Sequence, residues 1–148
     1  MEAGAFAIKN MEIRRINDDE KGLMSWIEEL TGKPADLLVP TAEFQHAYFE
    51  AFQDGKIIGF SVVLKCDKWI LDALFVHPDH RGRAIAGKLT DARIVFAGQN
   101  GAREIWYCCG DRNTASLLSH NGYKFAKVRK AAPGEAPEPA HWYKMDII

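Results

Sequence analysis

The stretch LFVHPDHRGRAIAGKL, residues 74–89, decides how this chain folds. An apolar run with high β propensity, Trp69 to Val76, is followed by a short basic turn, Arg81 to Gly87, and then by a helix. The N–H groups of a first helical turn have no partner inside the helix, and the macrodipole adds positive potential there. The stretch therefore predicts an anion site, with Arg81 and Arg83 placed to pair with phosphate. The simpler alternative is an ordinary strand–turn–helix with two solvated arginines.

Length and composition limit what such a site can serve. The chain has 148 residues, of which 47% are hydrophobic, which suffices for one sizeable core and not for two ordinary domains. The formal net charge of −1 provides no field suited to nucleic acid. We therefore expect a single domain over residues 1–148, whose first ten residues could be disordered, and no nucleic-acid partner.

The cysteines and the hydropathy favour a cytoplasmic protein. Cys66, Cys108 and Cys109 are odd in number, two of them are adjacent, and no C-x-x-C pair is present. The histidines lack the spacing of metal ligands, so no metal is expected. No apolar run approaches the roughly 18 residues of a membrane span, and the first residues lack the layout of a signal peptide. No membrane partner is expected.

Apolar periodicity and turn residues predict alternating strands and helices. Asp54-Gly55 is a strong hairpin signal, and Gly98 and Gly101 are expected to end the central helix. The predicted strands are residues 11–16, 47–52, 57–64, 69–76, 104–109, 123–128 and 142–148. The first predicted helix is capped by Asp18 or Asp19 and runs to about Leu30. The other predicted helices run from Ile85 to Ala97 and from Asn113 to Ser119, and residues 36–44 are ambiguous. This order predicts an α/β fold with a mixed, partly antiparallel sheet of six to seven strands and helices on both faces.

Two segments together resemble the GNAT superfamily of N-acetyltransferases. Residues 72–86 are similar to its acetyl-CoA motif, an apolar strand with V-x-P and an R/Q-x-x-G-x-G/A loop that opens the central helix. Asn113-Thr114-Ala115 with His120-Asn121-Gly122-Tyr123 resembles its second signature, an Asn–Ala helix ending in Gly-Phe or Gly-Tyr. The motifs cover roughly residues 45–125, and their joint occurrence is more specific than either alone. The resemblance implies the GNAT fold, in which the central strands splay apart.

Acetyl-CoA is the acyl donor that the resemblance implies. The loop amides would hold its pyrophosphate where the helix begins, and its pantetheine arm would pair with the edge of the central strand like an added β-strand. The implied binding residues are Leu74, Phe75, Val76, Arg81, Gly82, Arg83, Ala84, Ile85, Ala86, Gly87, Asn113 and Ser116. Asn113 could instead be a helix N-cap alone. Ala84 stands where the family usually has a glycine, and its methyl group could crowd the pyrophosphate or shift the turn.

The implied reaction is direct transfer of an acetyl group to a primary amine in a ternary complex. It needs a base for the ammonium group, a hydrogen-bond donor to the thioester carbonyl and a proton for the leaving thiolate. Asp72 is the candidate base, because strand alternation would place it on the face of Leu74 and Val76. A solvated or lysine-paired carboxylate is the equally weighted alternative. The expected oxyanion donor is a backbone N–H near Phe75 or Val76.

The proton donor is less well defined by the sequence. Leu118 stands where the family often has a tyrosine, so Ser119 and Tyr107 are the remaining candidates, although Tyr107 could be a buried structural residue. A thiolate can also leave unaided. The alternative function is a non-catalytic acyl-CoA-binding or interaction domain, in which Ala84 and Leu118 mark an eroded site; without the resemblance, a small ligand-binding module remains. The acceptor could be a small-molecule, peptide or protein amine, and a homodimer stays open.

Overall fold

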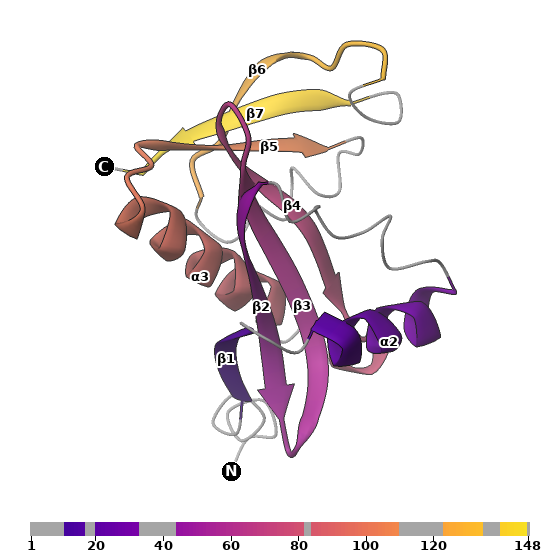
Figure 1. Cartoon of the computed structure of the whole chain (residues 1–148). Coiled ribbons are helices and arrows are strands. Elements are labelled where there is room, and N and C mark those ends of the chain that lie inside the picture. The colour runs from indigo at the N-terminus through magenta and orange to yellow at the C-terminus, as the bar shows by residue number, and fades with distance from the viewer. Residues whose placement is uncertain are drawn as a thin grey trace.

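A single mixed sheet carries the fold. The computed structural model describes residues 11–16, 20–32, 44–81, 84–109, 123–134 and 140–147. Within these ranges seven strands follow the order β1-β2-β3-β4-β5-β7-β6 (Figure 1). The strands are β1 (Met11–Ile16), β2 (Gln45–Gln53), β3 (Lys56–Lys65), β4 (Trp69–Val76), β5 (Glu104–Cys109), β6 (Ala126–Lys130) and β7 (His141–Asp146). The helices are α2 (Glu20–Thr31), the 3₁₀ turn η2 (Pro78–His80) and α3 (Ile85–Gln99).

The strand directions are those of the predicted α/β fold. Strands β1 to β4 pair antiparallel in sequence order, β4 pairs parallel with β5, and β5, β7 and β6 are again antiparallel. A parallel pair needs a crossover connection, which α3 provides between β4 and β5. The prediction of a mixed, partly antiparallel sheet is thus confirmed.

Helices α3 and α2 cover opposite faces of the sheet. Leu89 of α3 packs in the main core cluster with Val63 of β3. Ile27 of α2 packs in a second cluster with Phe60 and Val62. Neighbouring strand residues point to opposite faces, so the adjacent Val62 and Val63 place the two helices on different sides, as Figure 1 shows. Helices on both faces are therefore confirmed.

The hairpin between β2 and β3 forms where the sequence predicts it. Asp54 and Gly55 have φ values of 51° and 77°. Positive φ at both central residues is the conformation of a type I′ turn, whose twist matches that of the flanking strands. The local turn chemistry therefore fixes the register of these two strands.

The bounds of helix α3 and strand β6 differ from the predicted ones. Helix α3 continues through Gly98 to Gln99, and the glycine with left-handed backbone is Gly101, at a φ of 92°. A glycine therefore ends this helix only where its conformation is needed. Strand β6 lies a few residues later than predicted because β7 sets its register, and Ala131 beyond it donates its N–H to the Ala140 oxygen at 2.9 Å.

Some predictions fall outside the described residues. These are the capping role of Asp18 or Asp19, the helix over 113–119, and almost all of the ambiguous segment 36–44. No helix in the part of the chain that the structure describes combines the length and the apolarity needed to cross a membrane.

We expect Gly59→Ala to lower the free energy of unfolding by about 1–3 kcal/mol, the cost of overpacking a core. A Cβ at this β3 position would lie 3.1 Å from the Phe75 oxygen and 3.3 Å from Leu89 Cδ1. Gly98→Ala is the matched control, since a Cβ there meets only Ile147 Cδ1 at 3.8 Å. The control should stabilise α3 by about 0.5–1 kcal/mol. Urea unfolding of both variants provides the measurement, and equal effects would contradict this packing.

Candidate functional site

Strand β4 is paired unequally along its two edges. With β3 it is paired along its length as far as Gly59↔Val76, and His77 extends the ladder by donating its N–H to the Ile58 oxygen at 2.8 Å. With β5, the described residues show register at one position, Ile70↔Trp106. Figure 1 shows the two strands running in different directions. Beyond Ile70 the edge of β4 that faces β5 is thus open to another hydrogen-bonding partner.

A β-bulge lies in β4 where this opening begins. Val63 pairs with Leu71 and Ser61 pairs with Leu74, so that Val62 stands opposite the two residues 72 and 73. An extra residue on one strand interrupts the alternation of side chains. The alternation argument that placed Asp72 on the face of Leu74 therefore does not hold. Asp72 is exposed, and its assignment as a base stays a prediction.

Arg81 folds back onto the end of β4. Its Nε donates to the Val76 carbonyl oxygen at 3.0 Å, and its guanidinium carbon lies 5.5 Å from the centre of the Phe75 ring. The turn η2 leads to it, with the Nδ1 of His77 accepting the N–H of Asp79 at 3.1 Å. These contacts place an exposed cation beside the open end of the strand, where an anion can reach it.

Helix α3 begins without a side-chain cap. Ala84 occupies the N-cap position with φ 62° and ψ 14°, and its side chain makes no capping hydrogen bond. The first helical bond runs from the Lys88 N–H to the Ala84 oxygen at 3.1 Å. The N–H groups of Ile85, Ala86 and Gly87 therefore have no acceptor within the helix, and the first turn carries no acidic residue. This is the arrangement that binds a phosphate group.

The predicted binding residues contribute in different ways. The side chain of Ile85 belongs to the core, and Gly87 is also buried, so these two can offer a ligand only their backbone. Leu74 and Phe75 are half-buried on opposite faces of β4, in the clusters under α3 and α2 respectively. Val76 is buried and presents backbone alone. The site is therefore built mainly of peptide groups.

Several predicted site residues lie outside the described ranges. Gly82 and Arg83 are in this group, and so are Asn113, Ser116 and Ser119, together with Leu118. Their proposed contacts with the donor, and the role of Ser119 as an acid, stay predictions.

The sequence reasoning missed a buried polar group beneath the opening. Arg93 of α3 is 2% exposed, and burial lowers its pKa to about 10. Tyr107 and Asp72, both candidate catalytic residues, are among the groups whose charges oppose that shift. The two candidates thus lie around one guanidinium. The sequence does contain a signal for this buried residue, because Arg93 interrupts the row of apolar residues at i, i+4 spacing on α3.

Tyr123, the first described residue after Cys109, contacts the start of α3. Its hydroxyl lies 3.0 Å from the Gly87 carbonyl oxygen and also contacts the carboxylate of Asp91. Burial and the neighbouring Asp91 raise the pKa of Tyr123 well above its usual value. Tyr123 is therefore a neutral anchor at neutral pH.

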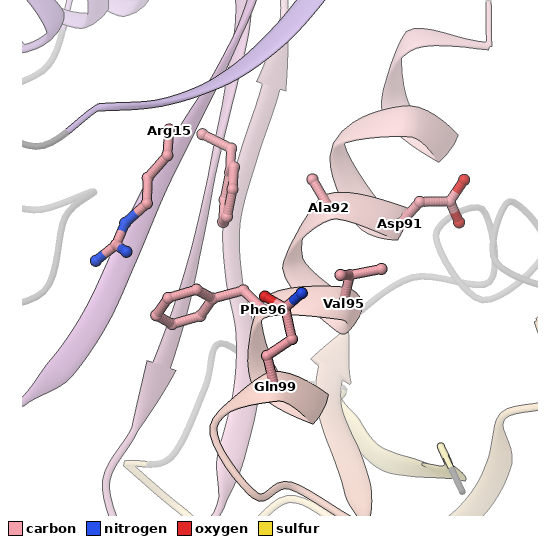
Figure 2. Close-up of a pocket in the computed structure, with 7 residues that line it drawn as sticks. Arg15, Asp91, Ala92, Val95, Phe96 and Gln99 are labelled. Carbon is pink, nitrogen blue, oxygen red and sulfur yellow. The ribbon is translucent and has the colours of Figure 1, made fainter.

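Two cavities lie away from this opening. One, of about 460 Å³, is a groove in which Arg15 of β1 faces Ala92, Val95 and Phe96 of α3 (Figure 2). The other, of about 670 Å³, lies between α2, the β2–β3 hairpin and η2, and includes Trp26. The combination of an open strand edge with an uncapped helix start belongs to neither cavity.

An open strand edge beside an uncapped helix start is an arrangement that can accommodate an extended, phosphate-bearing ligand. Residues 12–123 match the family described as the acetyltransferase (GNAT) family. The chain therefore belongs to the GNAT family of acetyltransferases, as its motifs suggested. A comparison with curated proteins finds no match.

Solved structures of low sequence identity share this fold. An acetyltransferase from Streptococcus agalactiae superposes with a TM-score of 0.70 at 16% identity, covering 94% of this chain and 99% of the other. A Bacillus subtilis acetyltransferase in complex with CoA gives 0.70 at 14% identity over 93% and 99%. A GNAT family acetyltransferase from Elizabethkingia anophelis with acetyl-CoA bound gives 0.65 at 16% identity over 93% and 99%. The predicted GNAT fold is confirmed.

We expect Ala84→Gly to raise the free energy of unfolding by about 1 kcal/mol, because it removes a Cβ from a left-handed residue. The matched control is Ala86→Gly, two residues later within α3, which should lower stability by about 0.5–1 kcal/mol. Thermal and urea unfolding measure both changes. A destabilised Ala84→Gly variant would contradict the left-handed start of α3.

Proposed function

We propose that the protein transfers an acetyl group from acetyl-CoA to a primary amine, by direct attack in a ternary complex. The observation that carries this proposal is the open edge of β4, which ends beside the uncapped start of α3. Membership of the GNAT family and the CoA-bound neighbours from two bacteria support the donor. A small molecule, a peptide or a protein could provide the amine.

The residues present fit the donor in two places. The N–H groups of Ile85, Ala86 and Gly87 would hold its pyrophosphate, with Arg81 adding charge from the preceding turn. The backbone of β4 from Leu74 to Val76 would bind the amide groups of its pantetheine arm, since these mimic a peptide. Ala84 adds a methyl group at this loop, and we expect CoA binding to survive it.

The same opening supplies the groups for transfer. A backbone N–H near Phe75 or Val76 would polarise the thioester carbonyl. Asp72, exposed at the bulge, would accept the proton of the ammonium group through water. Tyr107, half-buried on the neighbouring β5, is the proton donor that the described residues offer. The bound donor supplies an activated acyl group to the attacking amine.

Binding of CoA to the full-length chain tests the donor. Titration calorimetry should show saturable heat, and acetyl-CoA should compete. We expect Arg81→Gln to weaken CoA binding about five- to tenfold, because one charge-assisted contact with phosphate is lost. Arg103→Gln, at an exposed arginine before β5, is the matched control and should bind like the wild type. Absence of binding by the wild type would overturn the proposed function.

Kinetics with a panel of amines test the transfer itself. Initial rates are measured at varied concentrations of acetyl-CoA and amine. Their double-reciprocal plots should give intersecting lines, as direct attack in a ternary complex requires. Parallel lines would indicate a covalent acyl-enzyme instead. CoA binding without any acetyl transfer across small amines, peptides and protein N-termini would favour the non-catalytic alternative.

Substitution of Asp72 by Asn tests the base. We expect kcat/KM to fall about 10²-fold or more at low pH, where most of the amine is protonated and depends on the base. The loss should shrink as pH rises and free amine becomes abundant. A pH–rate profile identical to that of the wild type would remove Asp72 from this role.

A further inference from the structure

Arg93 is a charged residue in the middle of an apolar stripe. On α3 the positions Ile85, Leu89, Arg93 and Ala97 recur every four residues, and all four are at most 2% exposed. Burial of a guanidinium is costly unless its donors are satisfied, and an apolar residue would pack here at no such cost. The arginine must therefore be held by specific partners.

Its partners are carbonyl groups at the bulge. Nη1 donates to the oxygens of Val62 and Asp72, each at 3.3 Å, so one nitrogen connects β3 with β4 where their pairing is interrupted. Nη2 donates to the Thr90 hydroxyl at 2.9 Å, which in turn donates to the Ala86 oxygen at 2.8 Å. Arg93 thereby satisfies backbone groups that a bulge removes from the ladder.

The charges around Arg93 show where it lies relative to the opening. The titratable groups near it are Asp72 of β4, Tyr107 of β5 and Tyr123, and each favours the charged form of Arg93 when it carries its own negative charge. Asp72 lies two residues after Ile70 and Tyr107 lies directly after Trp106, and Ile70↔Trp106 is the one pair that the described residues show in register between β4 and β5. The guanidinium, charged at neutral pH, therefore lies where the two strands begin to separate.

We propose that Arg93 is a positioning residue for acetyl transfer: it holds the bulge of β4 and maintains a positive charge where β4 and β5 separate, which favours departure of the CoA sulfur as a thiolate. The inference rests on the proposed function and goes beyond it by assigning this step to a buried residue of α3. Leu118, which replaces the family's frequent tyrosine, offers no proton. A fixed cation favours the thiolate at the moment of bond cleavage, before a proton donor such as Tyr107 acts on it.

The step balances without a further reactant. The amine nitrogen forms a bond to the thioester carbon, the carbon–sulfur bond breaks, and its electron pair leaves on sulfur. The proton that the amine loses passes through water to Asp72. A nearby opposite charge lowers the pKa of an acidic group, so we expect Arg93 also to lower the pKa of the free CoA thiol bound at this opening.

The test is the pKa of the CoA thiol bound to the full-length protein without acceptor, followed by the ultraviolet absorbance of the thiolate. In the wild type it should lie about one unit or more below that of free CoA. Arg93→Gln keeps an amide donor for the carbonyls but no charge, and the thiol should return to the free value. Arg93→Lys keeps the charge and should retain the lowered value. Arg103→Gln, at the exposed arginine, should change nothing.

The outcomes separate this inference from the proposed function. A wild-type complex whose thiol titrates like free CoA overturns the role of Arg93 while leaving donor binding intact. The role of Arg93 is also overturned if Arg93→Gln binds CoA and keeps the lowered pKa of the thiol, or if Arg93→Lys binds CoA and loses that lowered pKa. Should Arg93→Gln fail to fold, the pKa of the bound thiol in the wild type and in Arg93→Lys still tests the role of Arg93. A wild type that binds no CoA contradicts the proposed function itself.

Discussion

The buried guanidinium of Arg93 donates hydrogen bonds to two backbone oxygens, those of Val62 and Asp72. It does so at the point where the register between β3 and β4 shifts by one residue. Two residues of β4 opposite one residue of β3 bend the strand and leave peptide groups unpaired. The arginine satisfies them from α3, so helix and strand are fixed to each other at the bulge. The course of β4 beyond this point, and hence its open edge, depends on that connection.

The open edge and the start of α3 act together because one short segment joins them. Strand β4 ends at Val76, η2 follows, and α3 begins at Ile85. Arg81 returns to the Val76 oxygen within this connection. An extended ligand that binds along the strand is thereby led to the N–H groups of the helix, which is the chemistry expected of a donor with peptide-like groups and phosphates.

The sequence predicts those features that depend on local chemistry. The bounds of β1, β4 and β5 are as predicted, and Asp54-Gly55 forms its turn, because alternation and turn residues act over a few positions. For the candidate site, the sequence predicts the strand end, the basic turn and the helix start, whose contacts with a ligand stay predictions. The bulge at residues 72 and 73 was not, since it arises from the register with β3. The burial of Arg93 likewise depends on carbonyl groups more than twenty residues away along the chain.

Backbone amide resonances recorded during a titration with CoA test the central claim most directly. The account predicts that the amides of Ile85, Ala86 and Gly87 shift together with those of Leu74 to Val76, because one ligand spans both elements. Shifts confined to other parts of the chain, or shifts at the helix start with β4 unaffected, would contradict a ligand lying along the open strand edge.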